Sequence, residues 1–156
     1  MTVEEVLNRY GEEFVEELKR NIVAKGGVAS GAMTDPENLY AHVVQDEPGV
    51  YTLYLESTPY LKWWDSGTRP HWMPVKPLID WVENKGIVPE ERNGYLPTVE
   101  ELPYMIQHKI AREGTPGHDN TVQVVADAVF IRFERQLQEA LLDEVGDMLK
   151  GLPVKY

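Results

Sequence analysis

Apolar side chains recur at helical spacing near the start of the chain. Thr2 and Glu5 form the T-x-x-E pattern of a capping box, which commonly opens a helix, and Gly26-Gly27 is a typical helix end. Between these signals an apolar residue falls on one face every three or four positions, which predicts a helix over 2–25. The positions on that face are Val3, Val6, Leu7, Tyr10, Phe14, Leu18 and Ile22.

The pattern changes to alternation in the next part of the chain. Residues 39–46 and 49–57 are rich in β-branched and aromatic side chains, and a short turn separates them. This arrangement predicts an antiparallel β-hairpin. The leucines of its second strand share one face, which we expect to be core. Residues 59–64 are predicted as a further extended or turn-like piece, so the β region covers 38–64.

Three helices are predicted after the hairpin. A short helix covers 75–85 and ends before Gly86. A second T-x-x-E box at Thr98 opens a helix that runs to about Glu113, with an irregular first turn at Pro103. The last helix begins at 120 or 121 and ends near 150. Its apolar stripe, which is more often core or subunit interface than ligand groove, consists of Val122, Val125, Val129, Phe133, Leu137, Leu141, Val145, Met148 and Leu149.

These elements predict an α+β fold. The chain of 156 residues has the usual size of one domain and can bury roughly 70% of its extended surface. We therefore predict a single domain over 1–156. It has an N-terminal helix (2–25), a β region with a small antiparallel sheet built on the hairpin (38–64), and a helical region (75–150). The helical region holds two shorter helices and a long C-terminal helix.

Composition restricts the classes of function. Cysteine is absent, which excludes disulfides and thiolate metal sites and fits a reducing cytoplasm. The N-terminus lacks the features of a signal peptide, and no apolar run approaches the ~20 residues of a membrane span. The net charge of −11 disfavours binding to a nucleic-acid backbone, which depends on Lys and Arg.

The acidic residues are unevenly placed. Between Gly26 and Leu61 there is no Lys or Arg. The five acids of this stretch are Asp35, Glu37, Asp46, Glu47 and Glu56. They predict either an ordinary solvated face or a surface that repels DNA.

Motifs that would carry catalysis, a cofactor or a metal are missing. No Gly-rich phosphate loop, no G-x-S-x-G elbow and no H-E-x-x-H occurs. His42 lies in a predicted strand and is expected to be structural, whereas His118 is expected on the surface. We therefore predict no catalytic residue, no cofactor and no metal site.

One segment, YLKWWDSGTRPHW (60–72), concentrates aromatic and polar side chains. Asp65 to Thr68 have the composition of a turn, in which Gly67 can adopt a positive φ. Tryptophans supply large apolar area with a polar handle and suit interfaces as well as cores. The residues that we predict at an oligomer or partner interface are Tyr60, Trp63, Trp64, Arg69, His71 and Trp72. The alternative is a small hydrolase that uses Asp65, His71 and a Ser or Thr.

The order of several short motifs resembles a family of tailed-bacteriophage proteins, the neck and tail-completion proteins often described as minor tail components. The residues that carry the resemblance are Ser30-Gly31-Ala32-Met33, Tyr60, Gly67-Thr68-Arg69-Pro70, Met73-Pro74, Pro77, Ile79, Trp81-Val82, Lys85-Gly86-Ile87, Tyr104, Ile106, Lys109-Ile110 and Gly114-Thr115-Pro116. They span roughly residues 30–118.

The resemblance implies a virion structural protein with no catalytic residues. Such a protein is a subunit of a homo-oligomeric ring, a hexamer or dodecamer, in the neck or the head-proximal tail. It assembles in the host cytoplasm, contacts neighbouring phage neck and tail proteins, and lets DNA pass without specific binding; no membrane is involved. One ring interface is expected around 60–72 and another on the long C-terminal helix. A third hypothesis is an inhibitor that binds a host protein through the acidic face.

Overall fold

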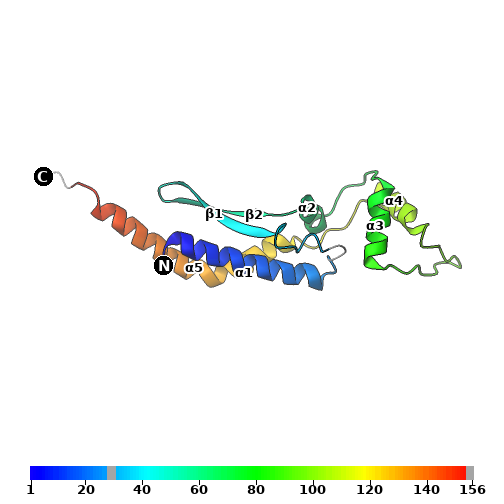
Figure 1. Cartoon of the computed structure of the whole chain (residues 1–156), viewed down its shortest axis with the longest axis horizontal. Helices are drawn as coiled ribbons and strands as arrows, with labels where there is room; N and C mark the ends of the chain where they lie inside the picture. Colours follow the sequence, from blue (N-terminus) through cyan, green and yellow to red (C-terminus); the bar gives the residue numbers. More distant parts are fainter. Residues whose placement is uncertain (28–30, 154–156) are drawn as a thin grey trace. The chain divides into compact units, whose positions relative to one another are not determined.

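The computed structural model describes residues 1–27 and 31–153 and has the predicted α+β fold (Figure 1). Ser30, at one end of the resemblance, lies outside the described residues. The elements are α1 (Val3–Ala24), β1 (Tyr40–Glu47), β2 (Val50–Glu56), α2 (Pro59–Ser66), α3 (Val75–Lys85), α4 (Leu102–Glu113) and α5 (Thr121–Lys150).

The chain divides into two compact units. Unit 1 comprises 1–21, 36–57 and 121–156, and unit 2 comprises 22–35 and 58–120. Unit 1 therefore holds most of α1, the hairpin and α5, while unit 2 holds α2, α3 and α4. One domain over 1–156 stays a prediction.

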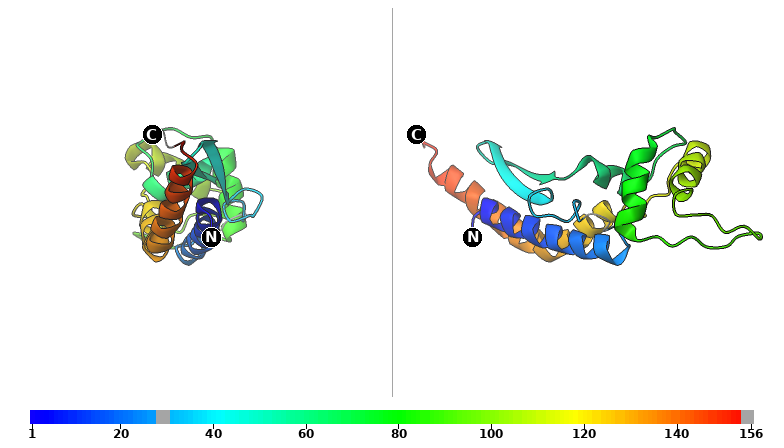
Figure 2. Two further views of the ribbon diagram at one scale, coloured as in Figure 1. Left: turned by 90° about the vertical axis from the view of Figure 1, so that its left-hand side faces the viewer. Right: turned by 45° about the vertical axis from the view of Figure 1, so that its right-hand side comes forward.

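Unit 1 is built on two helices that run side by side, α1 and α5 (Figures 1 and 2). The predicted capping box opens α1: the Thr2 N–H donates to Glu5 Oε2 (2.8 Å) and the Glu5 N–H to Thr2 Oγ1 (3.2 Å). Tyr10 joins the helices, because its hydroxyl donates to the Ala126 carbonyl (3.0 Å) and its ring meets that of Phe133 edge to face. The buried apolar residues of this unit are Val3, Val6, Phe14, Val15, Leu18, Leu39, Val125, Val129, Phe133 and Ala140.

The hairpin is confirmed, but it is less covered than the sequence suggested. β1 and β2 pair antiparallel, with His42 opposite Tyr54. The leucine face points toward α1, where a Cβ on Gly11 would lie 3.1 Å from Leu53. No residue of either strand is fully buried. The leucine face is therefore only partly covered, whereas the sequence predicted that it would be core. A two-stranded sheet offers too little area for its own core.

Unit 2 packs three short helices. α3 and α4 contact each other. The core includes Leu61, Leu78, Val82 and Ile110. A buried amide completes it: Gln107 Nε2 donates to the Met73 carbonyl (2.7 Å), which satisfies a polar group that would otherwise be costly to bury. The long connection from α3 to α4 doubles back at an Asn93-Gly94 turn (Figure 2).

Two predicted elements of unit 2 need correction. Residues 59–64 are not extended but form most of α2, because Pro59 has the right φ for a first helical turn and Leu61 finds a buried site. α4 begins at Leu102, later than predicted. Glu101 does accept a hydrogen bond from the Thr98 N–H (3.1 Å), but this bond belongs to a separate turn that precedes the helix. The helix itself starts at Leu102 and has Pro103 in its first turn.

Candidate interaction surface

Two glycine-rich segments lie against each other in unit 2 and form what we term the glycine clasp, residues 65–70 and 114–118. The N–H of Thr68 donates to the Thr115 carbonyl (3.0 Å), the N–H of Thr115 returns the bond (3.2 Å), and the two threonine hydroxyls lie 2.8 Å apart. The His118 N–H donates to the Asp65 carbonyl (2.8 Å). The clasp thus joins the end of α2 to the end of α4.

Glycine is required where the two backbones touch. At Gly67 (φ 75°, ψ −177°) an added Cβ would lie 2.5 Å from the Thr115 carbonyl oxygen. At Gly117 it would lie 2.6 Å from the Ser66 carbonyl carbon, and at Gly114 it would meet the Thr68 carbonyl oxygen. Such contacts are with backbone atoms, which cannot rotate away, so only a residue without a side chain fits.

Trp64 and His118 fill the inner side of the clasp. Their rings stack with centroids 4.2 Å apart, and His118 Nδ1 lies 2.6 Å from the Trp64 carbonyl oxygen. Both residues are partly buried. His118 thus lies in a loop, as expected, but the Trp64 ring covers part of its surface. Trp64 belongs to the packing of unit 2, unlike the other aromatic residues predicted at the interface.

The remaining predicted interface residues are exposed. Tyr60 and Trp63 on α2 meet edge to face and are 62% and 50% exposed. Arg69, His71 and Trp72 lie along the extended segment that leaves the clasp, and Trp72 is 63% exposed. The structure does not bring all six residues into one cluster, because Trp64 turns inward.

The exposed segment after the clasp lies beside α4. The His71 N–H donates to the Ile110 carbonyl (3.3 Å), and the Trp72 ring meets the His108 ring edge to face at 5.5 Å. The imidazole of His71 is held by the Arg69 carbonyl oxygen, 2.8 Å from its Nδ1. That partner orients the ring but activates no nucleophile. We term Arg69, His71, Trp72, His108 and Arg112 the Trp72 surface.

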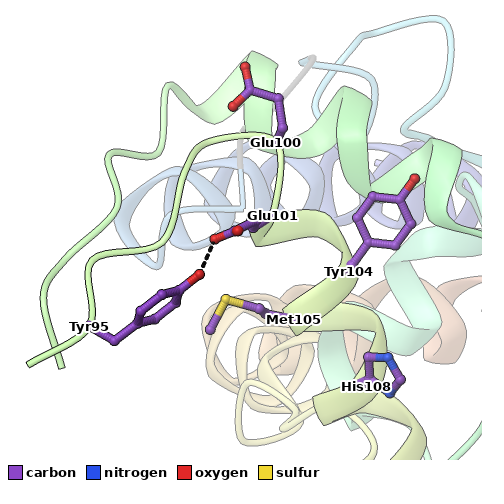
Figure 3. A pocket seen from close by; sticks show the side chains of 6 residues that line it. All are labelled: Tyr95, Glu100, Glu101, Tyr104, Met105 and His108. Atoms are coloured by element: carbon purple, nitrogen blue, oxygen red, sulfur yellow. Dashed lines mark hydrogen bonds between the residues drawn. The ribbon is translucent and has the colours of Figure 1, made fainter. Parts of the chain in front are cut away.

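A shallow groove adjoins the Trp72 surface along α4 (Figure 3). Its volume is about 480 Å³, and its lining residues are Tyr95, Glu100, Glu101, Tyr104, Met105 and His108. The side chains of Tyr104, Met105 and His108 project from the face of α4 opposite the buried Pro103, Gln107 and Ile110. Because Tyr104 and Met105 are about half exposed, this α4 groove suits a protein side chain better than an enclosed small molecule.

The wall of the α4 groove is fixed by one hydrogen bond. The Tyr95 hydroxyl donates to Glu101 Oε2 (2.6 Å). This bond, with a second from the Thr98 N–H, lowers the pKa of the Glu101 carboxyl below its ordinary value. The same bond to Glu101, helped by burial and by the carboxylate charge, raises the pKa of the Tyr95 hydroxyl. Tyr95 and Glu101 therefore stay protonated and ionised, respectively, over a wide pH range.

The five acids of the Gly26–Leu61 stretch are all exposed. Asp35 belongs to unit 2 and the other four to unit 1. Asp46 and Glu47 lie at the hairpin turn, where Asp46 accepts the Thr52 hydroxyl (2.7 Å), whereas Glu56 lies at the far end opposite Tyr40. They do not form one compact cluster.

The sequence contained a signal for the clasp that was not used. The Gly-Thr pair at 67–68 is repeated at 114–115, and the two pairs meet across the clasp. His108 gave no such signal, because its partner is 36 positions away in the sequence and only the fold brings them together.

Within residues 1–27 and 31–153, no group of three or more His, Asp or Glu side chains could hold a metal ion. None of the helices in the described part of the chain is long and apolar enough to cross a membrane. No protein-family model, curated protein or solved structure matches this chain.

Proposed function

We propose that this chain is a virion structural protein of a tailed bacteriophage, a subunit of a ring in the neck or head-proximal tail. The observation that carries the proposal is that each of the two units exposes large apolar side chains. In unit 2 they include Trp63, Trp72 and those of the α4 groove, and in unit 1 they include those of the last turns of α5 and of the outer face of the hairpin. Apolar surface of this kind marks interfaces.

Two separate apolar regions suit a cyclic assembly. In a ring each subunit meets its neighbours through two different surfaces. An isologous dimer would need only one such region. The motif resemblance supports the same function, since its Gly67-Thr68 and Gly114-Thr115 pairs are the residues that build the clasp beneath the Trp72 surface.

Virion incorporation and assembly test the proposal. We expect Arg69→Glu and Trp72→Ala to leave the subunit folded but to impair assembly, because both side chains are exposed and neither belongs to the core. Light scattering after size-exclusion chromatography measures the assembly, whereas circular dichroism and tryptophan fluorescence measure the folding of units 1 and 2, respectively. Mass spectrometry of purified virions made with tagged protein should find the chain in stoichiometric amounts.

Arg20→Glu is the matched control for Arg69→Glu. It makes the same change of charge at an exposed position of α1, where Arg20 pairs with Glu17 (3.3 Å) and donates to the Glu16 carbonyl (3.4 Å), both within its own helix. Normal assembly by both Trp72→Ala and Arg69→Glu would contradict the proposed interface. Absence of the chain from virions, together with capture of a stoichiometric host protein, would favour a host-directed inhibitor instead.

A further inference from the structure

The last turns of α5 present an apolar face to solvent. Ala140 is the last buried residue of the helix, and none of the described residues that follow it, 141–153, is buried. Leu142, Val145 and Leu149 recur at the spacing of one helix face and are 72%, 49% and 62% exposed. We term this face the α5 end. Its apolar side chains can be removed from water only by packing against another surface.

The charge around the α5 end narrows the choice of partner. Residues 136–149 contain no Lys or Arg. Their acids are Glu139, Asp143, Glu144 and Asp147. Glu139 pairs with Arg135 (3.0 Å) and Asp147 with Lys150 (3.2 Å), but exposed pairs of this kind contribute little and are readily exchanged. Glu139 and Asp143 lie one turn apart beside Leu142, so a partner needs apolar side chains with basic groups at their border.

The Trp72 surface has the basic groups, and the α4 groove beside it supplies apolar side chains, although Glu100 and Glu101 line its other end. Residues 66–79 and 102–112 contain no Asp or Glu, in a chain whose net charge is −11. Their basic residues are Arg69, Lys76, Lys109 and Arg112, all exposed. Arg112 lies 3.9 Å from Glu113 in a weak, exposed pair. On α4, Arg112 follows His108 by one turn on the face that carries Tyr104 and Met105.

We propose that the α5 end of one copy docks on the Trp72 surface and α4 groove of a second copy. A helix laid into a groove buries one residue in every three or four, as Leu142, Val145 and Leu149 require. Glu139 and Asp143 then approach Arg69 and Arg112 of the neighbour. The inference rests on the proposed ring and identifies the contact between its subunits.

A nucleic acid is the competing occupant of a basic, aromatic surface. The neighbouring carboxylates disfavour it, because Glu100 and Glu101 line the α4 groove and would repel phosphates. In the proposed docking, Lys150 at the end of α5 is the group that faces these carboxylates, whereas Glu139 and Asp143 face Arg69 and Arg112.

Two variants with opposite defects test the docking. The first variant, Arg69→Glu with Arg112→Glu, reverses the charge of the Trp72 surface and leaves the α5 end unchanged. The second variant, Glu139→Lys with Asp143→Lys, reverses the charge of the α5 end and leaves the Trp72 surface unchanged. All four side chains are exposed, so both variants should fold, as circular dichroism for unit 1 and tryptophan fluorescence for unit 2 would verify. We expect each variant alone to associate at least tenfold more weakly than the wild type, since like charges then oppose each other.

A mixture of the two variants is the decisive sample. Each has one intact surface, and the two reversed surfaces carry opposite charges, so the mixture should recover association into species of at least twice the 17.8 kDa chain, as seen by light scattering. A mixture that stays monomeric while the wild type assembles overturns this contact but leaves the ring proposal standing. Monomeric wild type at all concentrations, in 50 mM as in 500 mM salt, also overturns it. Binding of a fluorescein-labelled single-stranded oligonucleotide that is lost in the first variant would assign the surface to nucleic acid instead. Virion incorporation tests the proposed function independently of these outcomes.

Discussion

Replacing Gly67 by alanine should destabilise unit 2 far more than an ordinary surface substitution. The backbone at Gly67 (φ 75°, ψ −177°) lies in a region that is essentially restricted to glycine, and occupying it with another residue costs about 1–3 kcal/mol. In addition, the Cβ would lie 2.5 Å from the Thr115 carbonyl oxygen and 2.7 Å from the Gly117 nitrogen. The backbone shifts that relieve this close contact cost a further amount of about 1–3 kcal/mol. The total loss of about 2–6 kcal/mol is a large part of the free energy of unfolding of a typical domain, which is roughly 5–15 kcal/mol.

Gly86→Ala is the control for this prediction. Gly86 also has a positive φ (62°), at the end of α3, but an added Cβ would find no atom within 4 Å. Its cost is therefore limited to left-handed backbone strain of about 1–2 kcal/mol. Both glycines belong to unit 2, so one probe measures both variants.

Tryptophan fluorescence during urea unfolding is the appropriate assay. All four tryptophans lie in unit 2, namely Trp63, Trp64, Trp72 and Trp81. Far-UV circular dichroism reports mainly on the longest helices, α1 and α5, and so follows unit 1. Gly67→Ala should lower the free energy of unfolding seen by fluorescence more than Gly86→Ala does, with little change by circular dichroism. Equal losses in the two variants would refute the close backbone contact of the clasp.

Three further predictions follow from single hydrogen bonds and ring contacts. Tyr10→Phe should lower the free energy of unfolding of unit 1 by about 1 kcal/mol, measured by circular dichroism, because the Ala126 carbonyl loses its donor; an unchanged midpoint would contradict the bond. Because the pKa of Tyr95 is raised, its bond to Glu101 stabilises the fold fully below the ordinary tyrosine pKa of about 10 and is lost as pH rises through the folded pKa. Tyr95→Phe should therefore remove part of the alkaline loss of stability, and an identical pH profile would argue against that bond. His118→Ala should cost unit 2 about 1 kcal/mol and shift its tryptophan emission to the red, since the ring that stacks on the inward indole is gone; emission at the wild-type wavelength would contradict the stacking.

Local patterns were sufficient for the long elements. The spacing that predicted the first and last helices is a property of neighbouring residues, and α1 and α5 agree with it closely. The capping box at Thr2 likewise needs only residues three positions apart. The hairpin was predictable because alternation and a short turn are also local signals.

α2 was missed because a short apolar run does not distinguish a helix from a strand. Its eight residues bury only Leu61, so the sequence shows no clear apolar face. The stripe of the last helix was equally ambiguous about its partner. Val125 and Phe133 are core, whereas Val145 on the same helix is exposed, and the difference depends on where the other elements of unit 1 end.

The sequence by itself determined the α+β class, the long helices, the hairpin and the lack of any local catalytic or metal-binding motif. Only the tertiary structure decided which side chains of 60–72 face inward and which face solvent. Trp64 stacks on His118, 54 positions away, while Trp63 and Trp72 remain exposed. The physical reason is that the clasp depends on two backbones approaching each other, and spacing along a chain carries no information about which distant glycines will meet.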